Sequence, residues 1–115
     1  NLASICYLFR MFNGLEGRMV VVLEEPPTSL GPGMIHAEVM LSRAYAMWPL
    51  FICEKGLPLE EVRPNIWKKD MKLLRQDKEA SRLKALSLFP KADILRKMDH
   101  GRAEALLLAE WARRR

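Results

Sequence analysis

The chain has 115 residues, which suffice for one domain with a single hydrophobic core and leave no room for a second. Half of the residues are hydrophobic and 29% are charged, proportions that are usual in globular domains. Every apolar run is far shorter than the ~20 residues that a membrane-spanning helix needs, so we expect no membrane partner. Cys6 and Cys53 lie far apart and form no CxxC pair, which argues against a disulfide framework and a structural zinc site.

The positive charge is concentrated in the second half of the chain. Residues 1–53 hold three Lys/Arg and four Asp/Glu, whereas residues 54–115 hold sixteen and ten, so the net charges are −1 and +6. A strongly basic half indicates a polyanion such as nucleic acid bound on one side. A solvated basic surface that binds no polyanion is the alternative.

The first elements in chain order are an apolar stretch, a strand and a long helix. Residues 2–12 are apolar nearly all round and predict a buried helix, with no sign of a secretory signal peptide. Residues 18–27 (RMVVVLEEPP) predict a strand buried on both faces, as in a parallel sheet. After a loop at residues 28–33, residues 34–53 predict a helix with a wide apolar face, which Pro49 is expected to end or kink.

The second half predicts a short strand and three helices. Residues 56–64 indicate a turn and a strand closed by Pro64, and residues 65–74 and 77–89 show helical patterns. A polar connector leads to a last helix at about residues 101–114. This order is typical of a single α/β domain spanning residues 1–115, but two strands make too small a sheet. We therefore expect further strands before Asn1, in which case the chain is truncated at its N-terminus.

The start of the last helix carries unusual polar residues. Glu104 lies on the same helical stripe as Leu107, Leu108 and Trp111, where an unpaired carboxylate is costly to bury. Asp99 and His100 lie one turn earlier, so groups able to ligate a metal or transfer a proton converge there. The alternative is structural: Asp99 caps the helix, His100 lies on the surface, and the helix dipole favours the first-turn Glu104.

Glu24 is a second unusual position, because it ends the predicted buried strand and is followed by Glu25. Ligands of open α/β sheets gather beyond the carboxyl ends of the strands, although a simple loop charge would show the same pattern. If Glu24 lies within about 4–6 Å of Asp99 or Glu104, a cation is needed between the carboxylates, and hard oxygen ligands favour Mg²⁺ or Mn²⁺. Two such ions can assist an in-line displacement at phosphorus.

Several motifs then point to one family. LEEP after a valine run, PNIWKK, DKEASRLKALSLFP and KMDHGRAEALLLA occur in this order and at spacings that resemble the RuvC-type Holliday-junction resolvases. The resemblance is strongest to the monokaryotic-chloroplast branch, which shares the DHGRAEALL stretch, and it covers about residues 18–111. It implies an RNase H-like fold, in which helices flank a five-stranded mixed sheet. It also implies a homodimer that nicks four-way DNA junctions symmetrically with Mg²⁺ or Mn²⁺, in the chloroplast nucleoid if the source is a plant or alga and otherwise in the cytoplasm.

The resemblance also assigns roles to individual residues. The metal ligands would be Glu24, Asp99 and Glu104, with His100 beside them. The lysine near the scissile phosphate would be Lys68 or, as the alternative, Lys78. The cations expected to contact DNA phosphates are Lys68, Lys69, Lys72, Lys78 and Arg82.

One departure from the family pattern keeps two functions open. The family's first strand carries an essential Asp, and no Asp precedes Asp70 here. Either the chain is a fragment of a structure-selective endonuclease, or it is a non-catalytic module for nucleic-acid binding or dimerisation on the same fold. An unrelated helical interaction protein is a third possibility, and it predicts no clustering of Glu24 with Asp99 and Glu104.

Overall fold

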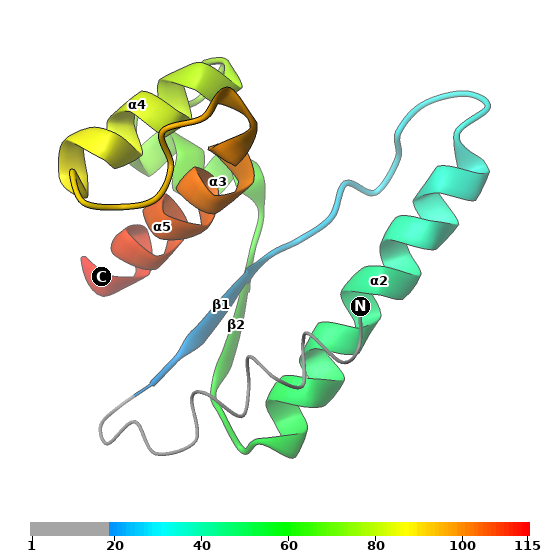
Figure 1. Ribbon diagram of the computed structural model, residues 1–115. Coiled ribbons are helices and arrows are strands. Elements are labelled where there is room, and N and C mark those ends of the chain that lie inside the picture. Colours follow the sequence, from blue (N-terminus) through cyan, green and yellow to red (C-terminus); the bar gives the residue numbers. More distant parts are fainter. Residues whose placement is uncertain (1–18) are drawn as a thin grey trace.

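The computed structural model describes residues 19–115, so the helix expected at residues 2–12 lies outside the described part. The described chain is a mixed α/β structure with a small parallel sheet and four α-helices (Figure 1). Its elements, in order, are β1 (Val21–Glu24), α2 (Ile35–Glu54), β2 (Leu59–Val62), α3 (Pro64–Asp70), α4 (Lys78–Leu88), the 3₁₀ turn η1 (Lys97–Asp99) and α5 (His100–Arg113).

The two strands confirm the parallel pairing that the valine run predicts. β1 pairs with β2 in a register that runs from Val21 opposite Leu59 to Glu24 opposite Val62, and α2 is the crossover between them. β1 is only half-buried along its length, so the expectation of burial on both faces is wrong for the described chain. The reason is that β2 is its single partner there, and a two-stranded sheet has little face to cover. Residues 19–115 confirm the predicted α/β class, and the sheet that they form has two strands, so the five-stranded RNase H-like sheet stays a prediction.

Helix α2 lies on one side of the strands, opposite α3, α4 and α5 (Figure 1). It continues through Pro49 to Glu54, so the expectation that Pro49 ends the helix is wrong. A 2.6 Å hydrogen bond from the Tyr45 hydroxyl to Glu61 Oε1 links the helix to β2, and Ile52, which follows the proline, is completely buried. This bond and this burial offset the amide bond lost at Pro49. No helix among residues 19–115 is long and apolar enough to cross a membrane.

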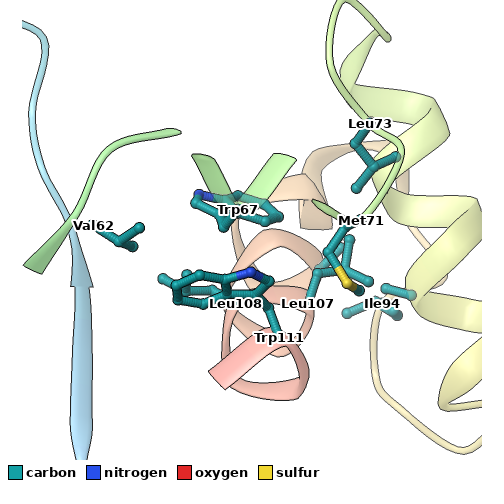
Figure 2. Packing of buried hydrophobic residues seen from close by; sticks show 10 residues of the cluster. Val62, Trp67, Met71, Leu73, Ile94, Leu107, Leu108 and Trp111 are labelled. Atoms are coloured by element: carbon teal, nitrogen blue, oxygen red, sulfur yellow. The ribbon is translucent and has the colours of Figure 1, made fainter. Parts of the chain in front are cut away.

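The hydrophobic core lies between β2 and the three C-terminal helices. Trp67 of α3 and Leu107 of α5 are completely buried, and Figure 2 shows them converging with Trp111 from the same layer. The amphipathic stripe predicted for the last helix faces this core. The buried members of the cluster are Val62, Trp67, Met71, Leu73, Ala85, Ile94, Ala103, Leu107, Leu108 and Trp111.

The ends of α3 and α4 follow from local chemistry. Pro64 occupies the first turn of α3, where its missing N–H is tolerated. The helix ends at Asp70, earlier than predicted, because Lys72 adopts φ 59° and Leu73 N–H donates to Lys68 O at 2.7 Å. This is a Schellman ending with a lysine in the position that usually holds glycine, and the buried side chain of Leu73 holds it in place. Asp77 caps α4 by accepting from Ala80 N–H at 2.8 Å, as the helical pattern from residue 77 predicts.

Candidate functional site

Glu24, the last residue of β1, is bound by a tryptophan from α3. Its Oε2 accepts a hydrogen bond of 2.6 Å from Trp67 Nε1. Because Glu24 pairs with Val62 and α3 begins two residues after that partner, the sheet register brings Trp67 to the end of β1. A completely buried indole needs an acceptor for its N–H, and the Glu24 carboxylate supplies it.

Glu104 on α5 is paired with the next residue of α3. Its Oε1 lies 3.1 Å from Lys68 Nζ, and both side chains are about one-quarter exposed, at 25% and 26%. The Lys68 ammonium also lies 5.3 Å from the centre of the Trp67 ring, within range of a cation–π contact. This pairing explains how a carboxylate is tolerated on the apolar stripe of α5.

These contacts bring three distant sequence motifs together. Glu24 comes from LEEP, Trp67 and Lys68 come from PNIWKK, and Glu104 comes from DHGRAEALL. We call these four residues the Glu24–Glu104 network. The sequence motifs assign no role to Trp67. Its position directly before Lys68 is the sequence feature that could have indicated a place in the site.

Asp99 is held by an arginine rather than by the last helix. Asp99 is only 4% exposed. Its carboxylate accepts a hydrogen bond of 3.0 Å from the Arg96 backbone N–H and two from the Arg96 guanidinium, at 3.2 and 3.0 Å. The hydrogen bonds from Arg96 hold the pKa of Asp99 below its ordinary value. The structural alternative in which the Asp99 side chain caps α5 is therefore wrong, because this carboxylate belongs to the capping box of η1. The spacing of three residues between Arg96 and Asp99 was the sequence signal for this pair.

His100 begins α5 and is only partly exposed. Its Nδ1 lies 3.3 Å from the carbonyl oxygen of Lys97, which orients the ring toward the preceding turn. This contact lies within its own turn, so the expected place of His100 beside the metal ligands stays a prediction.

The three proposed metal ligands are engaged separately within the described chain. Glu24 binds Trp67, Asp99 binds Arg96, and Glu104 binds Lys68. Within residues 19–115, no three His, Cys, Asp or Glu side chains form a group that could hold a metal ion. The expected cluster of three carboxylates is therefore not formed by these residues, and they do not fit a two-metal site on their own.

The proposed DNA-contacting cations fall into two groups. Lys69, Lys72 and Lys78 are exposed, and Lys68 lies at the edge of the core. Arg82 is different, since its side chain is only 11% exposed. Its guanidinium bonds to Glu79 and to two main-chain carbonyl oxygens between α4 and η1. The structure gives Arg82 a structural role, and we leave it out of the proposed DNA-contacting set.

Comparison with protein-family models and with curated proteins finds no match to this chain. Its function is therefore inferred from the residues of the site.

Proposed function

We propose that this chain is a RuvC-type domain that recognises four-way DNA junctions, as in the Holliday-junction resolvases. The observation that carries the proposal is the Glu24–Glu104 network. Three of the four motifs in which the sequence resembles that family meet through two direct contacts, near the carboxyl end of β1. The described residues form no cluster of three carboxylates, which is what an unrelated helical protein predicts, so the proposal rests on the network of residues 24, 67, 68 and 104 and not on that cluster.

The DNA surface in this proposal is the basic side of α3 and the start of α4. Exposed lysines bind phosphates without regard to sequence, so the geometry of the junction, rather than base edges, would supply most of the selectivity. The contributing side chains are Lys68, Lys69, Lys72 and Lys78.

Lys68 has a special position among these cations. Glu104 neutralises its ammonium in the free protein, and a phosphate oxygen would compete with Glu104 for the same group. In the resolvase reaction, a lysine beside the scissile phosphate stabilises the negative charge that develops there. The partly exposed Lys68 is the residue of this chain that we assign to that role.

The family reaction is hydrolysis of a phosphodiester bond with Mg²⁺ or Mn²⁺, and we assign no metal-dependent step to the described residues. Their engagement with Trp67, Arg96 and Lys68 favours a second candidate function, a non-catalytic junction-binding or dimerisation module on the same fold. The endonuclease and a non-catalytic junction-binding module both bind DNA and differ in hydrolysis, whereas a dimerisation module requires no DNA.

Binding is tested by titrating a fluorescent four-way junction, and a linear duplex of the same sequence, with the 115-residue chain. We expect tighter binding to the junction and a steep loss of affinity with salt. Lys78→Ala should flatten the logarithmic salt slope by about one, because one phosphate contact is lost. Arg43→Ala on α2 removes the same charge away from this surface and should leave the slope unchanged. Equal affinity for the two DNAs, or affinity that ignores salt, would contradict the proposal.

Hydrolysis separates the two candidates. With Mg²⁺ or Mn²⁺ added, we expect the chain to bind junctions and to nick them barely or not at all. Rapid metal-dependent nicking that Glu24→Gln abolishes without loss of binding would exclude the non-catalytic module. The homodimer implied by the resemblance is tested in the same samples by light scattering after size exclusion, with and without junction DNA.

A further inference from the structure

The connection between α4 and α5 holds two apolar side chains out into solvent. Residues 93–99, which we call the 93–99 turn, include η1 and lie against both helices, as the yellow-to-orange segment in Figure 1. Within this turn, Leu95 is 73% exposed and Met98 is 71% exposed. Single exposed hydrophobic residues are common on protein surfaces, so the informative feature is what holds these two in place.

The backbone around Leu95 is fixed from both sides. Ile94 is 1% exposed and anchors the turn in the core. The buried guanidinium of Arg82 donates to the carbonyl oxygens of Ile94 at 3.2 Å and Leu95 at 3.0 Å. The Arg96–Asp99 hydrogen bonds close the other end of the turn. Turning Leu95 inward would break hydrogen bonds of buried groups, which is costly, so the turn presents it to solvent rigidly.

The surroundings of the two side chains are basic. Between residues 91 and 102 there are four cations and two carboxylates, and because Arg96 pairs with Asp99 and Arg102 with Asp93, the excess positive charge is that of two lysines. The cations are Lys91, Arg96, Lys97 and Arg102. An apolar pair within a basic surface fits a ligand that offers both negative charge and exposed flat apolar faces.

The 93–99 turn is continuous with the proposed DNA surface at both ends. Lys97 belongs to η1, which packs against α4, and the first residue of α4, Lys78, is exposed. At its other end the turn leads into α5, whose second turn carries Glu104 in contact with Lys68. Phosphates bound along these cations would pass the two apolar side chains.

We propose that Leu95 and Met98 form an apolar wedge that packs against unstacked bases at the branch point of a DNA junction, while the neighbouring cations bind the phosphates. Leucine and methionine are among the side chains that other proteins insert at interrupted base steps. The branch point interrupts base stacking, so less stacking remains to be broken there than within a continuous duplex. This inference rests on the proposed junction binding and adds the residues that recognise the branch point.

The experiment uses a four-way junction that carries the fluorescent base 2-aminopurine at the branch point, together with a duplex carrying it at the same position. Binding of the 115-residue chain should raise the fluorescence of the junction at saturation, and that of the duplex much less. The double variant Leu95→Ala/Met98→Ala should lose most of this rise and bind the junction about tenfold more weakly, equivalent to ~1.4 kcal/mol. Its salt slope should not change, because no charge is removed.

Leu50→Ala is the matched control, because Leu50 is also 73% exposed but lies on α2, away from the basic surface. It should change neither the fluorescence nor the affinity. Since Leu95 and Met98 are exposed, the double variant should keep the thermal unfolding midpoint of the parent chain, and this measurement excludes misfolding as the cause.

The outcomes separate the wedge from the junction binding on which it rests. Tight, salt-dependent junction binding with unchanged 2-aminopurine fluorescence would overturn the wedge alone. Absence of junction binding at low salt would overturn the proposed function as well. Loss of binding to anionic lipid vesicles in the double variant, with junction binding intact, would assign the turn to a membrane surface and overturn the wedge.

Discussion

Helices α2 and α5 show how differently two apolar helical patterns are used in this chain. α5 has 14 residues and buries five of them, whereas α2 has 20 residues and buries only Ile52. Ile35 at the start of α2 is 72% exposed, while Leu107 in the middle of α5 is completely buried. The difference is that α5 packs between α3 and α4, whereas α2 packs against β2.

The difference in burial distinguishes the layer of α3, α4 and α5, which holds the candidate site, from the more exposed helix α2. The residues of the Glu24–Glu104 network either lie in α3 and α5 or are bound to them. An apolar stripe stabilises a helix only where another element covers it, and among residues 19–115 the stripe of α2 is largely uncovered.

The largest expected effect is on stability, and it compares the two helices directly. Leu107→Ala should lower the free energy of unfolding by about 2–5 kcal/mol, because it leaves a cavity in a fully buried site. Ile35→Ala on α2 should change it by less than about 0.5 kcal/mol, as is usual at exposed positions. Urea denaturation measures both values. Equal losses would show that α2 is as firmly packed as α5.

The next effect concerns the link between β1 and the C-terminal layer. Trp67→Phe should cost about 1.5–3 kcal/mol, because the ring is largely kept but the hydrogen bond to a charged acceptor is lost. Glu24→Gln keeps an acceptor oxygen and should cost less. The double variant should lose no more than Trp67→Phe alone, since both changes act on the same hydrogen bond. Additive losses in urea denaturation would mean that the two side chains act independently.

A smaller effect on the unfolding midpoint should depend on pH, and it should differ between ion pairs with a buried carboxylate and ion pairs with an exposed one. The pKa of Asp99 is lowered in the folded chain, so its ionised form contributes stability above the ordinary Asp range. That contribution is lost as the pH falls through the folded-state pKa. Asp99→Asn should therefore lower the unfolding midpoint at pH 7, and the gap to the parent chain should narrow toward pH 3.

The control for this measurement is Asp93→Asn. Asp93 also pairs with an arginine, Arg102, but its side chain is 86% exposed, so its removal should have little effect at either pH. A gap that stays constant for Asp99→Asn, or an equal gap for Asp93→Asn, would contradict the assignment of Asp99 to a buried structural pair.

The smallest effect is on DNA affinity. Glu104→Gln removes the partner of Lys68 and should tighten junction binding by roughly twofold to fivefold, the equivalent of up to about 1 kcal/mol for one partly exposed ion pair. Glu54→Gln, at the end of α2, makes the same charge change outside the site and should leave affinity unchanged. Fluorescence anisotropy with a labelled junction measures both. Weaker binding by Glu104→Gln would mean that Glu104 positions Lys68 rather than competing with DNA.

Local signals in the sequence account for most of the secondary structure. The valine run and the following prolines predict β1, and the period of apolar residues predicts α2, α4 and α5 close to their observed ends. Pro49 was misleading because the helical turn that follows it is stabilised by the complete burial of Ile52, which depends on tertiary packing that the local pattern does not contain. The early end of α3 likewise depends on Lys72 in a backbone conformation that favours glycine.

For the candidate site, the sequence by itself determined which polar residues are unusual, and tertiary structure decided what each one contacts. The stripe position of Glu104 and the strand-end position of Glu24 are properties of helical and strand periodicity, so they are visible in the sequence. Lys68 and Trp67 are neighbours in the sequence, but Lys68 lies 36 residues from its partner Glu104 and Trp67 lies 43 residues from its partner Glu24. Only tertiary packing brings each pair together. Arg82 is a similar case. Its position on α4 predicts a DNA contact, but in the folded chain its guanidinium donates hydrogen bonds to main-chain carbonyl oxygens of the turn that follows α4. Periodicity is a local property of the chain, whereas the pairing of charges depends on the tertiary fold.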